Sequence, residues 1–291
     1  MSDTLPSDPI RPNYRKVFLT FARNSLVRDM TFRVNFILQC VSSIGWTLMN
    51  VGFYLIIFQY TDMIGQDSGW DRDRFFLFIA TTWFINSLVQ AFFMPNAQEF
   101  SELIRTGGLD FALLKPIDTQ FLISFRRVDW SALSNFLAGL VIAAVSLQSL
   151  ATREEDPMIP SLISVLLYVV FLACGVAIMY SLMICLSATS IWLGRNQTLY
   201  NFWFYITNFS RYPMEMYKVG LGWPLYGFFT FVIPVLLVVN VPARLLAKPI
   251  SPRTDEEWLL VGWAVLATLL SVFASRWVFS RALSSYRSAS S

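Results

Sequence analysis

The sequence predicts an all-α integral membrane protein. Hydrophobic residues make up 55% of its 291 residues, charged residues make up only 14%, and the mean hydropathy is +0.53. Since a soluble domain carries roughly 25% charged residues, this chain has too few polar side chains to cover a water-facing surface. Apolar runs long enough for a spanning helix recur along it. Aromatic residues reach 16%, which is typical of chains with many side chains at lipid and headgroup depth.

Residues that the sequence lacks exclude several classes of function. The chain has no His, which excludes imidazole acid–base catalysis, Ser-His-Asp and Cys-His nucleophile systems and His-ligated metals. Cys40, Cys174 and Cys185 lie in apolar runs and form no CxxC motif. A net charge of +3 is too small to indicate nucleic-acid binding. No GxxxxGK motif followed by Ser or Thr is present to bind nucleotide phosphates. We therefore expect no catalytic residue, no metal site and no cofactor in this chain.

The first predicted element is an amphipathic helix over residues 14–27. Its two sides carry different residues: Tyr14, Val17, Phe18, Phe21 and Ser25 on one, and Lys16 and Arg23 opposite. A basic amphipathic helix lies in the headgroup plane, with its charged side toward anionic lipid. Lys16, Phe18, Phe21 and Arg23 are therefore the predicted interface residues. The alternative is a helix that packs on the bundle.

Seven charge-free runs follow, and a spanning helix needs about 20 apolar residues. The runs are Val34–Thr61, Phe75–Gln98, Trp130–Thr152, Pro157–Gly194, Asn196–Ser210, Val219–Ala243 and Trp258–Ser275. The first three each fit one span, and the fourth fits a helix over residues 161–188. The run from Asn196 is short, but its continuation through Tyr212 and Pro213 completes a crossing. The last run extends past Arg276 to Phe279, because arginine near a helix end can place its charge in the headgroup region.

The run Val219–Ala243 supports two interpretations. It contains three glycines together with Pro224, Pro234 and Pro242, which favour two half-helices that enter and leave on the same side. Broken helices persist at membrane depth only where protein packs around them or where they line water. A re-entrant hairpin gives six spans, and a continuous crossing gives seven. In either case 14 of the 22 Lys and Arg residues lie on the side of the N-terminus, which is therefore predicted to be cytoplasmic.

The connection after the second span, residues 96–127, predicts a series of short helices. Asn96 and Glu99 have the spacing of a capping box, so a first helix is expected to run to Arg105. It is expected to end at Gly107-Gly108, because glycine tolerates the left-handed conformation of a helix end.

The second turn of this connection carries leucines. Asp110 is placed to cap the turn, and Lys115-Pro116 ends it. Leu113 and Leu114 lie between them, and exposed leucines favour a partner protein with a groove to cover them. The alternative is that the loop folds against its own bundle. Asp118 is placed to cap a third helix, which enters the next span.

No Asp or Glu lies inside any of the charge-free runs. Proton- and sodium-coupled transporters usually place a carboxylate at mid-membrane, so the pattern argues against a secondary carrier. A channel needs a polar or charged line along its spans, and a lipid-modifying enzyme needs clustered acid–base residues at one interface. A channel or carrier is the first alternative to an ATP-driven transporter, and a membrane-embedded enzyme is the second.

Two stretches of the sequence resemble type-2 ABC exporter permeases. The first is Ile104-Arg105-Thr106-Gly107-Gly108-Leu109-Asp110, followed by Leu113-Leu114-Lys115-Pro116. The second is Ser210-Arg211-Tyr212-Pro213, followed by Phe231-Val232-Ile233-Pro234 and Val241-Pro242-Ala243-Arg244. They are similar to the first cytoplasmic loop and to the segment before the last span in bacterial permeases that are encoded with a separate ATPase and often a second permease. With the spacing of the spans, the resemblance covers nearly the whole chain.

The resemblance implies one permease domain over residues 1–291. Residues 1–33 would form a cytoplasmic tail and an interface helix, and residues 281–291 a second cytoplasmic tail. Residues 34–280 would form a six-span bundle with a re-entrant hairpin before the last span. Such a protein is a multi-pass component of the bacterial plasma (inner) membrane, with both termini cytoplasmic.

The resemblance also implies partners. A separate ABC ATPase, which uses ATP and Mg²⁺, would dock on a coupling helix; its contact residues would be Arg105, Gly107, Gly108, Asp110, Leu113, Leu114, Lys115 and Pro116. The external re-entrant region would contain Arg211, Tyr212, Pro213, Pro234, Pro242 and Arg244. A second permease subunit, identical or homologous, would complete the pathway within membrane lipid. The apolar, aromatic-rich composition favours export of an amphipathic or lipid-like substrate.

Overall fold

The computed structural model describes residues 12–65, 68–154, 157–193, 197–247 and 255–286, and over these residues it is helical with no β-strand. The far N-terminal residues and the last residues of the predicted C-terminal tail lie outside the described ranges. Five helical stretches are long and apolar enough to cross a membrane. They contain α2 (Arg33–Ile57), α3 (Arg72–Phe92), α7 (Leu133–Ala151), α8 (Leu162–Ala188) and α13 (Asp255–Ser285). This arrangement confirms the predicted all-α membrane protein.

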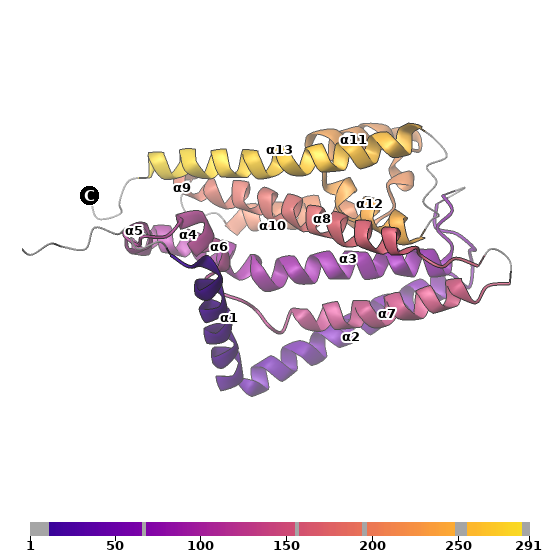
Figure 1. The fold of residues 1–291 in the computed structure, drawn as a ribbon, viewed down its shortest axis with the longest axis horizontal. Helices are drawn as coiled ribbons and strands as arrows, with labels where there is room; N and C mark the ends of the chain where they lie inside the picture. The colour runs from indigo at the N-terminus through magenta and orange to yellow at the C-terminus, as the bar shows by residue number, and fades with distance from the viewer. Residues whose placement is uncertain (1–11, 66–67, 155–156, 194–196, 248–254, 287–291) are drawn as a thin grey trace, which may run out of the picture.

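The short helices gather at the two ends of the bundle (Figure 1). One end, here called the loop end, holds α1 (Tyr14–Thr31), α4 (Met94–Arg105), α5 (Gly108–Leu113), α6 (Thr119–Phe125) and α9 (Ser190–Leu193). The last turns of α13 lie there too, so α1 and the end of α13 are on the same side of the bundle. The opposite end, here called the hairpin end, holds the connections between α2 and α3 and between α7 and α8.

The stretch that the sequence predicts as the fifth span is discontinuous. It consists of α10 (Gln197–Asn208), which has 12 residues, followed by the 3-10 helices η1 (Phe209–Arg211) and η2 (Met214–Tyr217). The chain leaves α9 at the loop end. It reaches the hairpin end by η2, where the Glu215 carboxylate accepts a 3.2 Å hydrogen bond from the indole N–H of Trp70 in the α2–α3 connection. The predicted fifth span is therefore a short helix extended by irregular turns, because Pro213 follows a residue held in extended conformation and prevents a continuous helix.

The segment before the last span is bent. It consists of η3 (Gly220–Gly222), α11 (Trp223–Gly227), the π-helical turn η4 (Phe228–Val232) and α12 (Val235–Ala247). The two halves meet at 86°, and Ile233 is extended at the break because it precedes Pro234. Arg244 near the end of α12 forms an ion pair with Glu215 of η2. The segment thus begins and ends at the hairpin end, which favours the re-entrant hairpin over a seventh span.

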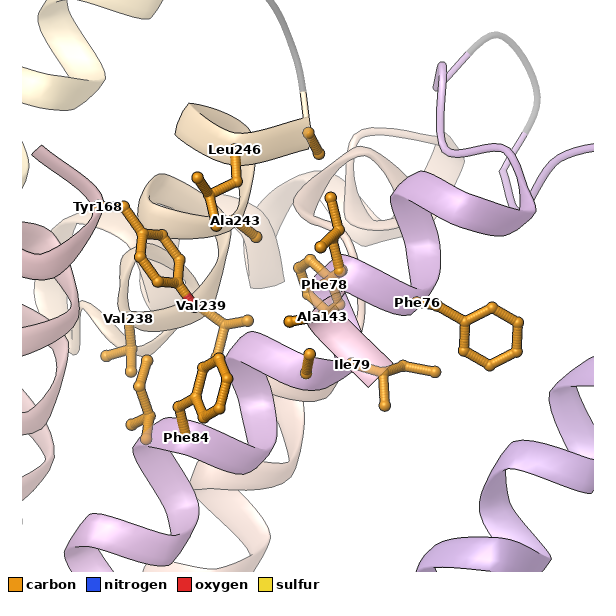
Figure 2. Packing of buried hydrophobic residues seen from close by; sticks show 14 of the residues in the cluster. Phe76, Phe78, Ile79, Phe84, Ala143, Tyr168, Val238, Val239, Ala243 and Leu246 are labelled. Carbon is orange, nitrogen blue, oxygen red and sulfur yellow. The ribbon is translucent and has the colours of Figure 1, made fainter. Parts of the chain in front are cut away.

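The core of the bundle is built around α3. Its buried side chains, among them Phe78 and Phe84, pack against α7, α8 and α12 (Figure 2). Gly175 of α8 lets α12 approach closely, because a Cβ at this position would lie 2.6 Å from the carbonyl oxygen of Val238. By contrast, α2 buries only Thr47 among its described residues and packs mainly on α7. Ser43 on α2 donates a 2.6 Å hydrogen bond to the Asn135 amide oxygen of α7.

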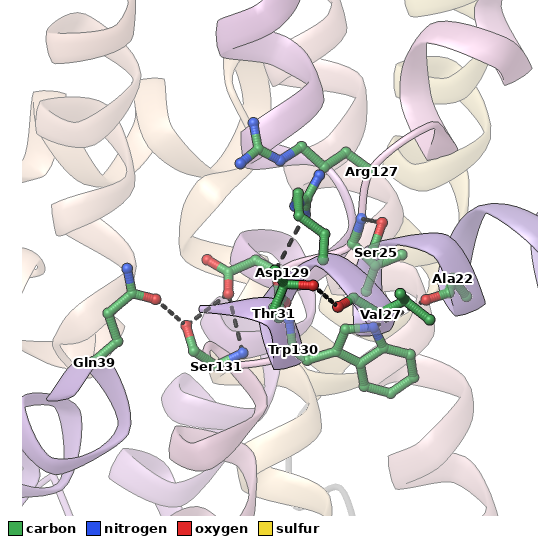
Figure 3. A network of polar contacts seen from close by, with 12 residues as sticks. Ala22, Ser25, Val27, Thr31, Gln39, Arg127, Asp129, Trp130 and Ser131 are labelled. Carbon is green, nitrogen blue, oxygen red and sulfur yellow. Dashed lines mark hydrogen bonds and ion pairs between the residues drawn. The ribbon is translucent and has the colours of Figure 1, made fainter. Parts of the chain in front are cut away.

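Helix α1 packs on the loop end through its aromatic side. Tyr14 contacts Phe121 of α6 with ring centroids 4.8 Å apart, and Phe18 contacts Phe125 at 5.7 Å. The indole N–H of Trp130 donates to the backbone carbonyl of Ala22 at 3.1 Å, in the polar network of Figure 3. Phe21 is half-buried, and Lys16 and Arg23 are exposed on the outside. A helix is therefore present over the predicted residues, and its aromatic side packs on the bundle, as in the alternative prediction. Its outer side carries Lys16 and Arg23 together with the exposed apolar residues Leu19 and Val27.

Candidate functional site

The connection over residues 96–127, here called the coupling loop after the role that the resemblance implies, begins differently from the sequence prediction. The prediction that Asn96 caps α4 is wrong, because α4 begins at Met94 with Pro95 in its first turn and Asn96 is a buried helical residue. The Asn96 amide instead bridges two chain segments. Its nitrogen donates to the backbone carbonyl of Arg127 at 2.7 Å, and its oxygen accepts from the Arg127 N–H at 2.9 Å. Asn96 therefore attaches α4 to the chain that follows α6.

The turn between α4 and α5 follows the prediction at its glycines. Helix α4 ends at Arg105, which is exposed and pairs with Glu102. Gly107 has φ +70°, a left-handed conformation that residues with a Cβ rarely adopt. Gly108 is the first residue of α5, and Gly107 holds its cap position. Asp110 therefore lies inside the first turn of α5, and the prediction that it caps this turn is wrong.

Helix α5 has a buried side and an exposed side. Leu109 is fully buried, and Ala112 is buried beside it in a cluster with side chains of α4, α6, α8 and α13. On the other side Phe111 is 74% exposed, Leu114 is 81% exposed and Leu113 is 40% exposed. These three residues are here called the apolar tip. The loop thus folds against its own bundle through one side of α5 and presents three apolar side chains on the other.

A cleft lies beside the apolar tip, between α4, α5 and α6. It has a volume of about 240 Å³, and its apolar lining includes Leu103, Leu122 and Ile123. Two cationic residues, Lys115 and Arg126, also line it. Lys115 and Pro116 are both exposed, so the predicted coupling residues surround an accessible surface at the loop end.

Asp118 caps α6 as the sequence predicted. Its side chain accepts a 2.9 Å hydrogen bond from the Phe121 N–H, and it also pairs with Arg276 of α13. The hydrogen bond from Arg276 is the main cause that holds the pKa of the Asp118 carboxyl below its usual range, with burial opposing it and the Phe121 N–H adding to it. The coupling loop is therefore connected by charge to the last span.

A buried amide attaches the bent segment to the turn before η2. Asn240 of α12 is fully buried; its oxygen accepts from the Met214 N–H at 2.8 Å, and its nitrogen donates to the carbonyls of Leu236 at 2.8 Å and Tyr212 at 3.4 Å. Pro213 is buried in the same turn. Sequence reasoning missed Asn240, although a lone amide between two prolines in an apolar run is a signal that could have identified it.

The other predicted hairpin residues have different roles. The exposed Arg211 guanidinium lies 5.5 Å from the centre of the Phe204 ring. Pro234 makes the bend, and Pro242 lies within α12, where its missing N–H leaves the carbonyl of residue 238 without its helical donor. That carbonyl is the one that Gly175 approaches. Arg244 pairs with Glu215, a link across the hairpin that no local pattern predicts.

A second charged cluster at the hairpin end joins α3 to the chain after α7. Arg153 contacts the carboxylates of Asp71 and Asp73, each at 2.8 Å, and Ser149 donates to Asp73 at 2.8 Å. Burial by itself raises the pKa of Asp71, but hydrogen bonds from Arg153 and from the Arg74 N–H outweigh it and lower the pKa overall. This cluster is satisfied internally. Among the described residues, no group of three or more Cys, Asp or Glu side chains is placed to hold a metal ion.

A family model described as ABC-2 family transporter protein matches residues 44–290. The chain belongs to the ABC-2 transporter family. Comparison with curated proteins and with solved structures gave no match. The matched region includes the coupling loop and the re-entrant hairpin, and α1 lies before it. As an ABC-2 family member, the chain is a membrane permease component of an ABC transporter.

The permease does not gather its predicted residues into one site. The predicted coupling residues from Arg105 to Pro116 lie together at the loop end, and Phe121 of α6, which follows them, contacts Tyr14 of α1. Arg211, Tyr212 and Pro213 precede Glu215 in the chain, and Glu215 pairs with Arg244 at the hairpin end. The predicted residues therefore lie in two separate regions, with the apolar core around α3 between them.

Proposed function

We propose that this permease is energised by a separate ABC ATPase that docks on the apolar tip and on the exposed residues beside it, from Arg105 to Pro116. The observation that carries the proposal is the tip itself. Phe111 and Leu114 are largely exposed, while Leu109 on the other side of the same short helix fixes α5 to the bundle. A short helix with exposed apolar side chains and a fixed base fits a groove on a partner protein.

The proposal places the loop end in the cytoplasm of a bacterium and the permease in its plasma (inner) membrane. Lys and Arg residues are in excess on that side, as the positive-inside rule requires. Lys16 and Arg23 on the outer side of α1 are then placed to meet anionic headgroups. Both ends of the described chain lie at the loop end, so both termini would be cytoplasmic.

The partner would supply all of the nucleotide chemistry. The sequence has no phosphate-binding loop, so ATP and Mg²⁺ belong to the ATPase and the permease contributes no catalytic residue. The centre of one chain is filled by α3 and its neighbours. We therefore infer that the pathway lies between two permease subunits, identical or homologous, and that ATP-driven closure of the ATPase dimer shifts them as rigid bodies.

The direction and the cargo follow from the resemblance and the composition. Exporters of this type move substrate away from the ATPase, and the aromatic, apolar walls suit an amphipathic or lipid-like molecule. A channel or carrier remains the second candidate, because the described spans carry buried hydroxyls such as Thr81 and Tyr168. A channel would move its solute in liposomes without any ATPase.

The test is isolation of the permease from cells that also express the ATPase encoded beside it. We expect the two to co-purify in detergent, with ATP hydrolysis in the complex and no nucleotide binding by the permease alone. Saturable ATP binding by the isolated permease would contradict the proposal. Purification without any ATPase, together with solute flux through the permease alone in liposomes, would favour the channel.

A further inference from the structure

We propose that Arg276 of α13 is a positioning residue that carries the movement of the coupling loop to the last span through Asp118. This inference rests on the proposed docking of an ATPase at the loop end. It concerns how that docking acts on the bundle, and it assigns a task to a cation that lies in an otherwise apolar stretch of α13.

The first observation is the geometry of the contact. One terminal nitrogen of Arg276 donates to Asp118 Oδ1 at 3.0 Å and to Gln120 Oε1 at 3.0 Å, and the other pairs with Asp118 Oδ2. A guanidinium that contacts both oxygens of a carboxylate fixes orientation as well as distance. Asp118 also caps α6. A rotation of α6 therefore has to move the Arg276 side chain or break several hydrogen bonds together.

The second observation is that α6 reaches a second span through the same polar group. The Gln120 amide nitrogen donates to the Tyr180 hydroxyl of α8 at 3.1 Å, and the hydroxyls of Ser124 and Tyr180 are 2.8 Å apart. Since Gln120 also accepts from Arg276, one side chain of α6 joins α8 and α13. The Tyr14 hydroxyl of α1 accepts from the Asp118 N–H at 3.4 Å. Helix α6 is thus the point where the interface helix, the coupling loop and two spans meet.

The third observation concerns what lies around this contact. Phe279, one turn along α13, packs near Phe100 of α4 with ring centroids 5.9 Å apart. Such apolar contacts hold surfaces together but permit sliding, because they have little directional preference. Arg281, further along α13, is exposed and forms no ion pair with a described residue. Arg276 is therefore the α13 cation placed to transmit a directed movement, and Arg281 is its natural control.

The experiment uses the complex of permease and ATPase in phospholipid nanodiscs, with the native cysteines replaced by serine. Spin labels are placed at the exposed Leu269 of α13 and the exposed Val141 of α7. The measured quantity is the change in the distance between the labels when ATP and vanadate are added, together with the ATP hydrolysis rate. We expect Asp118→Asn and Arg276→Gln each to abolish the distance change while hydrolysis continues. The double variant should be no worse than either single variant, because both remove the same contact.

Two controls separate transmission from folding. Asparagine is as good a helix cap as aspartate, so Asp118→Asn removes the charge and keeps α6. Arg281→Gln removes a cation from the same helix and should leave the distance change intact. A distance change that persists in Asp118→Asn and Arg276→Gln overturns the inference, and so does its loss in Phe279→Leu alone, which would assign transmission to packing. If no ATPase binds the wild-type permease, the proposed function itself fails and the inference fails with it.

Discussion

Replacement of Phe111 and Leu114 by aspartate tests the coupling surface most directly. Both side chains are largely exposed, so at least about three quarters of the area of each is available for burial by a partner. Complete burial of one such side chain is worth about 1.5–3 kcal/mol, which gives about 2–5 kcal/mol for the pair. Micromolar affinity corresponds to about 8 kcal/mol, and each 1.4 kcal/mol is tenfold. The double variant should therefore bind the ATPase at least about 30-fold more weakly.

The assay is titration of the purified permease variant with its ATPase, alongside its elution profile and thermal stability. We expect the variant to insert and to elute as a single species, because its substituted side chains lie in water. Ile159→Asp is the matched control, since Ile159 is 77% exposed at the hairpin end and should not affect binding. Leu109→Asp is the opposite control: it buries a charge and should prevent folding. Full ATPase affinity in a well-folded double variant would refute the docking role of the apolar tip.

Three further predictions concern the bundle and its loop. Gly175→Ala should lower the free energy of unfolding in detergent by about 1–3 kcal/mol, because the added Cβ would lie 2.6 Å from the carbonyl oxygen of Val238 in α12. Gly262→Ala is the control and should leave the free energy of unfolding unchanged, since a Cβ there meets nothing within 4 Å. An equal loss of stability in both variants would contradict the close-approach argument. Asn240→Leu should lower the free energy of unfolding by about 1–3 kcal/mol, the cost of one unsatisfied buried group, because the buried Met214 N–H loses its hydrogen-bond acceptor. If the variant is as stable as the wild type, another acceptor must replace the Asn240 amide. The pKa of Asp118 is lowered in the folded state, so the contribution of its carboxylate to the stability of the fold is complete above about pH 4 and is lost as the pH falls through the lowered value. The thermal stability of Asp118→Asn should therefore fall less on acidification than that of the wild type. Parallel pH profiles of the two proteins would contradict this prediction.

The spans were predictable because lipid permits few alternatives. A charge-free run of about 20 residues has to satisfy its backbone internally, so it forms a helix. Helices α2, α7, α8 and α13 each contain such a run. The exception was the run from Asn196, where a break at Pro213 decides the structure and where hydropathy gives no signal for the 3-10 turns that complete the crossing.

Contacts between distant segments were not predictable. The tip of α5 could be identified because Gly107 and Lys115-Pro116 mark its two ends locally. Asn96 was misassigned because its amide binds the backbone of Arg127, and this long-range partner outweighs the local capping pattern. The pairs that Arg276 makes with Asp118 and that Arg244 makes with Glu215 join segments far apart in sequence, so no spacing rule indicates them.

The distribution of polar contacts explains how such a permease can move. The ion pairs Arg276–Asp118, Arg244–Glu215 and Arg153–Asp71 lie at the two ends of the described bundle, whereas the middle of α3 meets α8 and α12 mainly through apolar side chains. Apolar surfaces can shift past one another without leaving a hydrogen-bonding group unpaired, whereas these partly exposed ion pairs fix the relative orientation of the segments that they join. The polar contacts therefore join neighbouring elements at each end, and apolar contacts join the spans between the two ends. A permease that alternates between two packings, as proposed above, can use oriented contacts at its ends together with an interior in which the described spans meet mainly through apolar side chains.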